Sequence, residues 1–133
     1  MDNSLNCDIR PLALVVDDDP LVRIDLVDML DDLGFNVVEA DCVSAALAFL
    51  QTGGERVSFL LTDVQMPGSR NGVTLTNRVS FVWPHIRILV TSGVSQPAVG
   101  ELPFQVQFIA KPVTPLALMA YVDKLTSPTP PPT

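Results

Sequence analysis

Residues 12–20 read LALVVDDDP, and this stretch decides the fold. Five apolar residues, Leu12 to Val16, run without a break into three aspartates and a proline. An apolar run without polar alternation is typical of a strand buried on both faces, as in a parallel sheet covered by helices. Asp19 is a suitable N-cap and Pro20 a suitable first residue for a following helix. The stretch therefore predicts the first strand and helix of an α/β domain, joined by an acidic turn.

The same alternation of short apolar runs and helical segments continues along the chain. Each run is rich in Val, Ile, Leu and Phe, and each helical segment is bounded by Gly, Pro or a capping residue. We expect strands at Leu12 to Val16, Asn36 to Ala40, Val57 to Thr62, Ile86 to Thr91 and Val106 to Ala110, and helices at Pro20 to Leu33, Ser44 to Leu50, Gly72 to Val82 and Thr114 to Leu125. Five such strands predict an α/β fold with a doubly wound, five-stranded parallel sheet.

Two segments depart from this alternation. Residues 93–105 contain two prolines, so the fourth helix, expected between the last two strands, is short or irregular. Residues 127–133 contain four prolines, which predicts a disordered, extended tail. We therefore divide the 133 residues into an N-terminal extension (1–11), one folded domain (12–126) and the Pro-rich tail.

The charge balance and the cysteines exclude several classes of protein. Eight Lys and Arg residues against fifteen Asp and Glu residues give a net charge of −7, which repels nucleic acid and anionic membranes. No apolar run approaches the about 18 residues of a membrane span, and residues 1–10 lack the apolar core of a signal peptide. Cys7 and Cys42 have no partners at disulfide or zinc spacing. We expect a cytoplasmic protein that binds neither nucleic acid nor membrane.

Polar side chains stand where the predicted strands end. The residues after the first, third, fourth and fifth runs include Asp17 and Asp18, Asp63, Ser92 and Lys111. The carboxyl ends of parallel strands meet at one edge of the sheet, where ligands of this architecture bind. We therefore expect several carboxylates, a hydroxyl and an ammonium to converge at that edge.

A carboxylate cluster of this kind needs a cation. Two carboxylates about 4 Å apart repel each other by about 4 kcal/mol at an effective dielectric near 20. Lys111 supplies one positive charge, whereas Mg²⁺ supplies two and prefers carboxylate and phosphoryl oxygens. With Mg²⁺, Lys111 and Ser92 around it, Asp63 can act as a nucleophile toward a phosphoryl group. Taken singly, the same residues have plainer interpretations, with Asp63 as a turn residue and Lys111 as a surface charge.

Four blocks of sequence resemble the receiver domains of two-component response regulators. They are VVDDDP at 15–20, LLTDVQMPG at 60–68, ILVTSG at 88–93 and FIAKP at 108–112. The resemblance covers almost the whole chain, in order, and implies the flavodoxin-like fold of a stand-alone, chemotaxis-regulator-like receiver. It also implies a protein that is not an enzyme in the ordinary sense but assists its own phosphorylation and dephosphorylation.

The resemblance implies how the acceptor and the metal are held. Asp63 would be the phosphoacceptor, and Asp17 and Asp18 would be the acidic pair, with Asp18 the more direct Mg²⁺ ligand. Gln65 would contribute its backbone carbonyl to the metal. The loop from Gly68 to Gly72 is one residue longer than the commonest receiver loop, which would reshape access beside Asp63.

The resemblance also implies a switch. Ser92 would be the hydroxyl that turns toward the phosphoryl group, preferred to Thr91 because a glycine follows it. Lys111 would pair with the phosphoryl oxygens, and its bond to Pro112 would be cis. Phe108 would stand where an aromatic ring reports phosphorylation by rotating, the alternative being an ordinary core phenylalanine.

We therefore expect a single-domain response regulator that takes a phosphoryl group from a phosphohistidine of a sensor histidine kinase or phosphotransfer protein. It would signal by binding a further protein of unknown identity, with a homodimer as one option, or serve as a phosphate sink. The alternatives are a Mg²⁺-dependent phosphatase with an aspartyl-phosphate intermediate and a binding module that needs no phosphorylation. His85, the single histidine, is expected to be structural and not a phosphate carrier.

Overall fold

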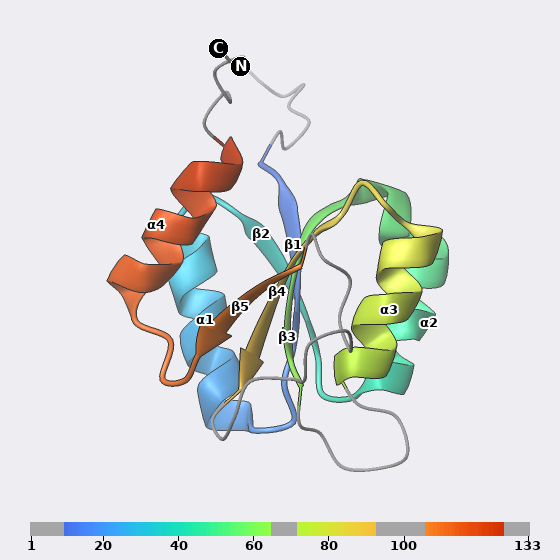
Figure 1. Cartoon of the computed structure of the whole chain (residues 1–133), viewed down its shortest axis with the longest axis horizontal. Helices are drawn as coiled ribbons and strands as arrows, with labels where there is room; N and C mark the ends of the chain where they lie inside the picture. Colours follow the sequence, from blue (N-terminus) through green and yellow to red (C-terminus); the bar gives the residue numbers. More distant parts are fainter. Residues whose placement is uncertain (1–9, 65–71, 93–105, 127–133) are drawn as a thin grey trace, which may run out of the picture.

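In the computed structural model, which describes residues 10–64, 72–92 and 106–126, the strands form one parallel sheet in the order β2-β1-β3-β4-β5 (Figure 1). The described strands are β1 (Leu12–Val16), β2 (Asn36–Ala40), β3 (Val57–Asp63), β4 (Arg87–Ser92) and β5 (Gln107–Ala110). The strand order reverses direction between β1 and β3. This confirms the predicted doubly wound sheet and places the reversal beside the acidic turn.

The helices lie on both faces of the sheet. Helices α1 (Pro20–Asp32) and α4 (Pro115–Thr126) cover one face, and α2 (Val43–Gly53) and α3 (Gly72–Val82) cover the other (Figure 1). Within the described ranges, none of these helices is long and apolar enough to cross a membrane. The predicted irregular fourth helix at residues 93–105, the extension before residue 10 and the tail 127–133 lie outside the described residues.

Helix α1 begins as its sequence predicts. The Asp19 carboxylate accepts hydrogen bonds from the backbone N–H groups of Leu21 at 3.0 Å and Val22 at 3.4 Å, and Pro20 occupies the first turn. After the helix, Gly34 has a φ of 99°, a conformation that favours glycine. The acidic turn and the helix start are therefore one structural unit.

Helix α2 differs from its prediction at both ends. It begins at Val43, one residue before the predicted Ser44, because Cys42 takes the N-cap position and its Sγ accepts from Ala45 N at 3.5 Å. It also runs past the predicted end into a short 3₁₀ helix, η1 (Gly54–Arg56). Gly54 has helical dihedrals and lies against the Trp83 indole, where a side chain would collide with the ring nitrogen. Glycine is needed there for close packing, and as the C-cap of α2 it also marks the point where the α-helix gives way to η1.

Two apolar clusters form the core, one on each face of the sheet. Leu14 and Val16 pack with α2 and α3, whereas Ala13 and Val15 pack with α1 and α4. All four of these β1 side chains are fully buried. Burial on both faces is the physical reason that this strand is apolar without alternation. It also fixes the position of the aspartates that follow it.

Candidate functional site

The neighbouring strands β1 and β3 bring three aspartates together at their carboxyl ends. Asp17 directly follows β1, and Asp63 is the last residue of β3. One carboxylate oxygen from each of Asp17, Asp18 and Asp63 lies within 4.8 Å of the other two. Asp17 is 0% exposed and Asp63 is 6% exposed, whereas Asp18 is open to solvent. The site is therefore two buried carboxylates with a third at the surface.

Lys111, immediately after β5, reaches into this cluster. Its Nζ donates to Asp63 Oδ2 at 2.9 Å and to Asp17 Oδ2 at 3.0 Å. Burial by itself would lower the pKa of Lys111, but hydrogen bonds to Asp63 and Asp17 and their negative charges outweigh it and raise that pKa above the ordinary 10.5. Lys111 is thus an ammonium at neutral pH, one positive charge facing three carboxyl groups. Its peptide bond to Pro112 is cis, as the resemblance implied.

Asp17 is held from several sides. Its Oδ1 accepts from the backbone N–H of Asp19 at 2.9 Å, and its Oδ2 accepts from Lys111. Its backbone N–H donates to Ala40 at 3.2 Å, and its carbonyl oxygen accepts from Arg23 at 2.7 Å. Both carboxylate oxygens of Asp17 therefore already have protein partners. This favours Asp18, at the surface, as the more direct ligand of an incoming cation.

The backbone around Asp63 is fixed by two other elements. The next residue, Val64, donates to Thr91 O of β4 at 2.9 Å and accepts from Gly72 N of α3 at 2.9 Å. A Cβ at Gly72 would overlap the carbonyl oxygen of Asp63 and come within 2.7 Å of Val64 Cα. Gly72 thus permits α3 to start against the end of β3. Its sequence signal is a glycine nine residues after the acceptor, which by itself predicts only a helix start.

The predicted switch residues are placed only in part. Ser92 ends β4 and pairs with Ala110 of β5, so its backbone lies at the same edge, but its side chain and all of Gln65 lie outside the described residues. The Thr91 side chain is buried, and its hydroxyl donates to Thr62 O at 3.5 Å, which turns it into the sheet. The Thr91 hydroxyl is therefore engaged within the sheet, and Ser92 stays the predicted switch hydroxyl. Phe108 is half-buried against the α2 and α3 face, which fits either interpretation of it.

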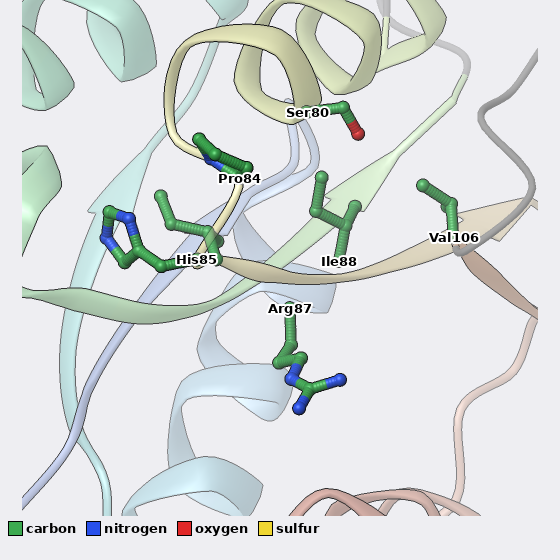
Figure 2. A pocket seen from close by; sticks show the side chains of 7 residues that line it. Ser80, Pro84, His85, Arg87, Ile88 and Val106 are labelled. Carbon is green, nitrogen blue, oxygen red and sulfur yellow. The ribbon is translucent and has the colours of Figure 1, made fainter.

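His85 lies far from the acidic edge, in the turn that precedes β4. One ring nitrogen, Nε2, is 3.0 Å from Gly54 O, a contact between this turn and η1. A cavity of about 310 Å³ lies at this amino end of β4, lined by Ile88, Val106 and His85 among others. Figure 2 shows the His85 ring pointing away from Ile88 and Val106. Among the residues that the structure describes, those lining this cavity include no carboxylate. The contact with Gly54 gives His85 the structural role that the sequence predicted.

Comparison with known proteins agrees with this geometry. Residues 13–123 match the family model of the response regulator receiver domain. Two relatives are the transcriptional regulatory protein AruR of Pseudomonas aeruginosa and the phyllosphere-induced regulator PhyR of Methylorubrum extorquens. AruR is 31% identical over 121 residues (86% of this chain, 49% of AruR), and PhyR is 24% identical over 120 residues (90% and 45%). The chain spans about half the length of the curated relatives it matches.

Among solved structures, a CheX–CheY complex from Borrelia burgdorferi, crystallised with BeF₃ and Mg²⁺, superimposes with a TM-score of 0.79. The sequence identity is 19%, and the match covers 89% of this chain and 90% of the other. The family match spans most of the folded residues, and the five-stranded sheet with its acidic edge agrees with it. The chain therefore belongs to the response regulator receiver domain family of two-component signalling.

Proposed function

We propose that this receiver accepts a phosphoryl group on Asp63 from a phosphohistidine of a histidine kinase or phosphotransfer protein. The observation that carries the proposal is the environment of the Asp63 carboxylate, which is 6% exposed, 2.9 Å from the Lys111 ammonium and within 4.8 Å of two further carboxylates. Burying a carboxylate costs free energy, so an aspartate that served only in a turn would not be expected to be buried beside two further carboxylates.

The three carboxylates fit Mg²⁺. They are hard oxygen donors, and no Cys or His stands in the cluster. Asp18 and Asp63 would hold the ion, with Asp17 beside them and the Gln65 carbonyl as the predicted fourth contribution. When bound, Mg²⁺ would offset the repulsion between the carboxylates and the phosphoryl oxygens. The crystallised CheX–CheY complex contained this ion, which supports the same use here.

The side chains of the chain itself perform the transfer. An Asp63 carboxylate oxygen attacks phosphorus and forms a P–O bond while the P–N bond of the phosphohistidine breaks, and the electron pair remains on the imidazole nitrogen. Lys111, already on Asp63 Oδ2, is close enough to stabilise charge on the phosphoryl oxygens. Ser92 would then donate to a phosphoryl oxygen, and Phe108 on the neighbouring strand would repack.

The partner that delivers the phosphoryl group would dock on the face formed by α1 and α4. Leu21 and Ile24 of α1 are 74% and 52% exposed, and Leu116 and Met119 of α4 are 72% and 39% exposed. Both helices lie on one face of the sheet (Figure 1), and a groove of about 360 Å³ lies between α1 and the segment from Lys111 to Val113 that precedes α4. Exposed apolar side chains beside a charged site suit a partner helix.

Cytoplasmic location, a downstream protein target and a homodimer stay predictions.

The test is incubation with Mg²⁺ and acetyl phosphate, followed by intact-protein mass spectrometry. We expect one phosphoryl group, removed by hydroxylamine, and no label in Asp63→Asn. Asp41→Asn is the matched control, because Asp41 is an exposed aspartate at the end of β2. Label that persists in Asp63→Asn would contradict the assignment of the acceptor. Repeated turnover of a phosphate ester would favour a phosphatase, and partner capture unaffected by phosphorylation would favour the binding module.

A further inference from the structure

Arg23 of α1 connects the acidic edge to β2. Its Nη1 donates to the carbonyl oxygen of Asp17 at 2.7 Å, and its Nε donates to Glu39 Oε1 at 3.0 Å. The Arg23 side chain is 18% exposed, so it lies along the protein and not in solvent. From the sequence alone, Arg23 is an ordinary charge on the first turn of a helix.

The carbonyl that Arg23 holds belongs to the peptide bond between Asp17 and Asp18. Because a peptide unit is planar, fixing the direction of that carbonyl also fixes the direction in which the chain enters Asp18. The other side of the turn is fixed by the Asp19 N–H, which donates to Asp17 Oδ1 at 2.9 Å. Asp18 has its carboxylate at the surface, and its orientation depends on these two backbone contacts.

We propose that Arg23 is a positioning residue that orients the Asp18 carboxylate for the cation, with Glu39 holding the guanidinium in place. This inference rests on the proposed function, since it concerns the same Mg²⁺ site. A guanidinium is suited to this role because its planar fork donates to two acceptors at once, which a lysine ammonium on a flexible stem does less rigidly.

Positioning and simple charge make opposite predictions. Arg23 is a positive charge close to a cation site, so removing it would tighten Mg²⁺ binding if only its charge mattered. If Arg23 instead orients Asp18, removing it weakens Mg²⁺ binding because the ligand must be ordered when the ion binds. The sign of the change therefore separates the two explanations.

The experiment is calorimetric titration of MgCl₂ into the wild type, Arg23→Met, Arg23→Lys and Arg10→Met. Arg10 is the matched control because it also joins the α1 and β2 region, through Asn36 at 2.6 Å and Asp31 at 3.7 Å, but at the opposite end of the sheet. We expect Arg23→Met to weaken Mg²⁺ binding about tenfold, or about 1.4 kcal/mol, Arg23→Lys to fall between, and Arg10→Met to match the wild type.

A second readout is hydrogen exchange at the Asp19 amide, which should become faster in both Arg23 variants and stay unchanged in Arg10→Met. If Arg23→Met or, should it not fold, Arg23→Lys binds Mg²⁺ as tightly as the wild type or more tightly, the inference is wrong and the proposed function stands. If the wild type itself does not bind Mg²⁺, both are wrong.

Discussion

Replacing Gly72 by alanine should damage both the stability of the domain and the reactivity of Asp63. The new Cβ would overlap the Asp63 carbonyl oxygen and lie within 2.7 Å of both Asp63 C and Val64 Cα. All three atoms belong to the backbone of the strand end, so no flexible side chain can move aside. The start of α3 and the end of β3 must therefore separate.

The expected cost follows from this crowding. Forcing one extra carbon into a packed site costs about 1–3 kcal/mol, and the better helix propensity of alanine returns at most about 1 kcal/mol. A net loss of about 2 kcal/mol would lower the Tm of a domain of this size by roughly 6–10 °C. Displacement of Asp63 should also lengthen its pairing with Lys111 and slow its phosphorylation several-fold.

The first assay is thermal denaturation, followed by circular dichroism. The second is phosphorylation by acetyl phosphate at a temperature well below the Tm of both the wild type and the variant. Gly34→Ala is the matched control because Gly34 has a positive φ of 99° but nothing within 4 Å of the added Cβ, and it lies between α1 and β2 at the other end of the sheet. Gly34→Ala should lose stability yet keep the wild-type phosphorylation rate. A Gly72→Ala protein with wild-type Tm and rate would refute the reasoning.

Two further predictions concern single side chains. Lys111→Ala leaves Asp17 and Asp63 without their shared cation. In denaturant titrations without Mg²⁺, the free energy of unfolding should therefore fall by about 1–3 kcal/mol, and added Mg²⁺ should recover part of that loss. An unchanged free energy of unfolding without the ion would contradict the pairing. Tyr121, the single tyrosine, has its pKa raised to about 12 by burial, partly opposed by Arg87. Because the unfolded chain ionises near 10, stability should be unaffected below pH 10 and fall between pH 10 and 12. Tyrosinate absorbance that appears near pH 10 in the folded protein would show that this side chain is not protected. Tyr121→Phe should lose the part of this pH dependence that Tyr121 contributes and keep the part due to Lys111, whose pKa is also raised.

The sequence predicted best the elements that turn or capping residues delimit at both ends. The bounds of β1, β2 and α3 agree with their predictions because apolar runs and flanking turn residues mark them directly. Strand β4 begins at Arg87, one residue later than predicted, because Ile86 N donates to Trp83 O and so belongs to the preceding turn. The extension of α2 toward Gly54 could not be predicted, since it depends on the indole of a residue 29 positions away.

The residue types at the strand ends are a property of the sequence alone. Asp17, Asp18, Asp63 and Lys111 follow apolar runs, and the rule that parallel strands end at one edge is enough to group them. Only the tertiary structure decided how they share their contacts. Lys111 bonds to aspartates 48 and 94 residues away because β5 lies on the same side of β1 as β3 and β4. Arg23 and Gly72 acquire their roles in the same way, through atoms that packing brings close and that sequence spacing does not reveal.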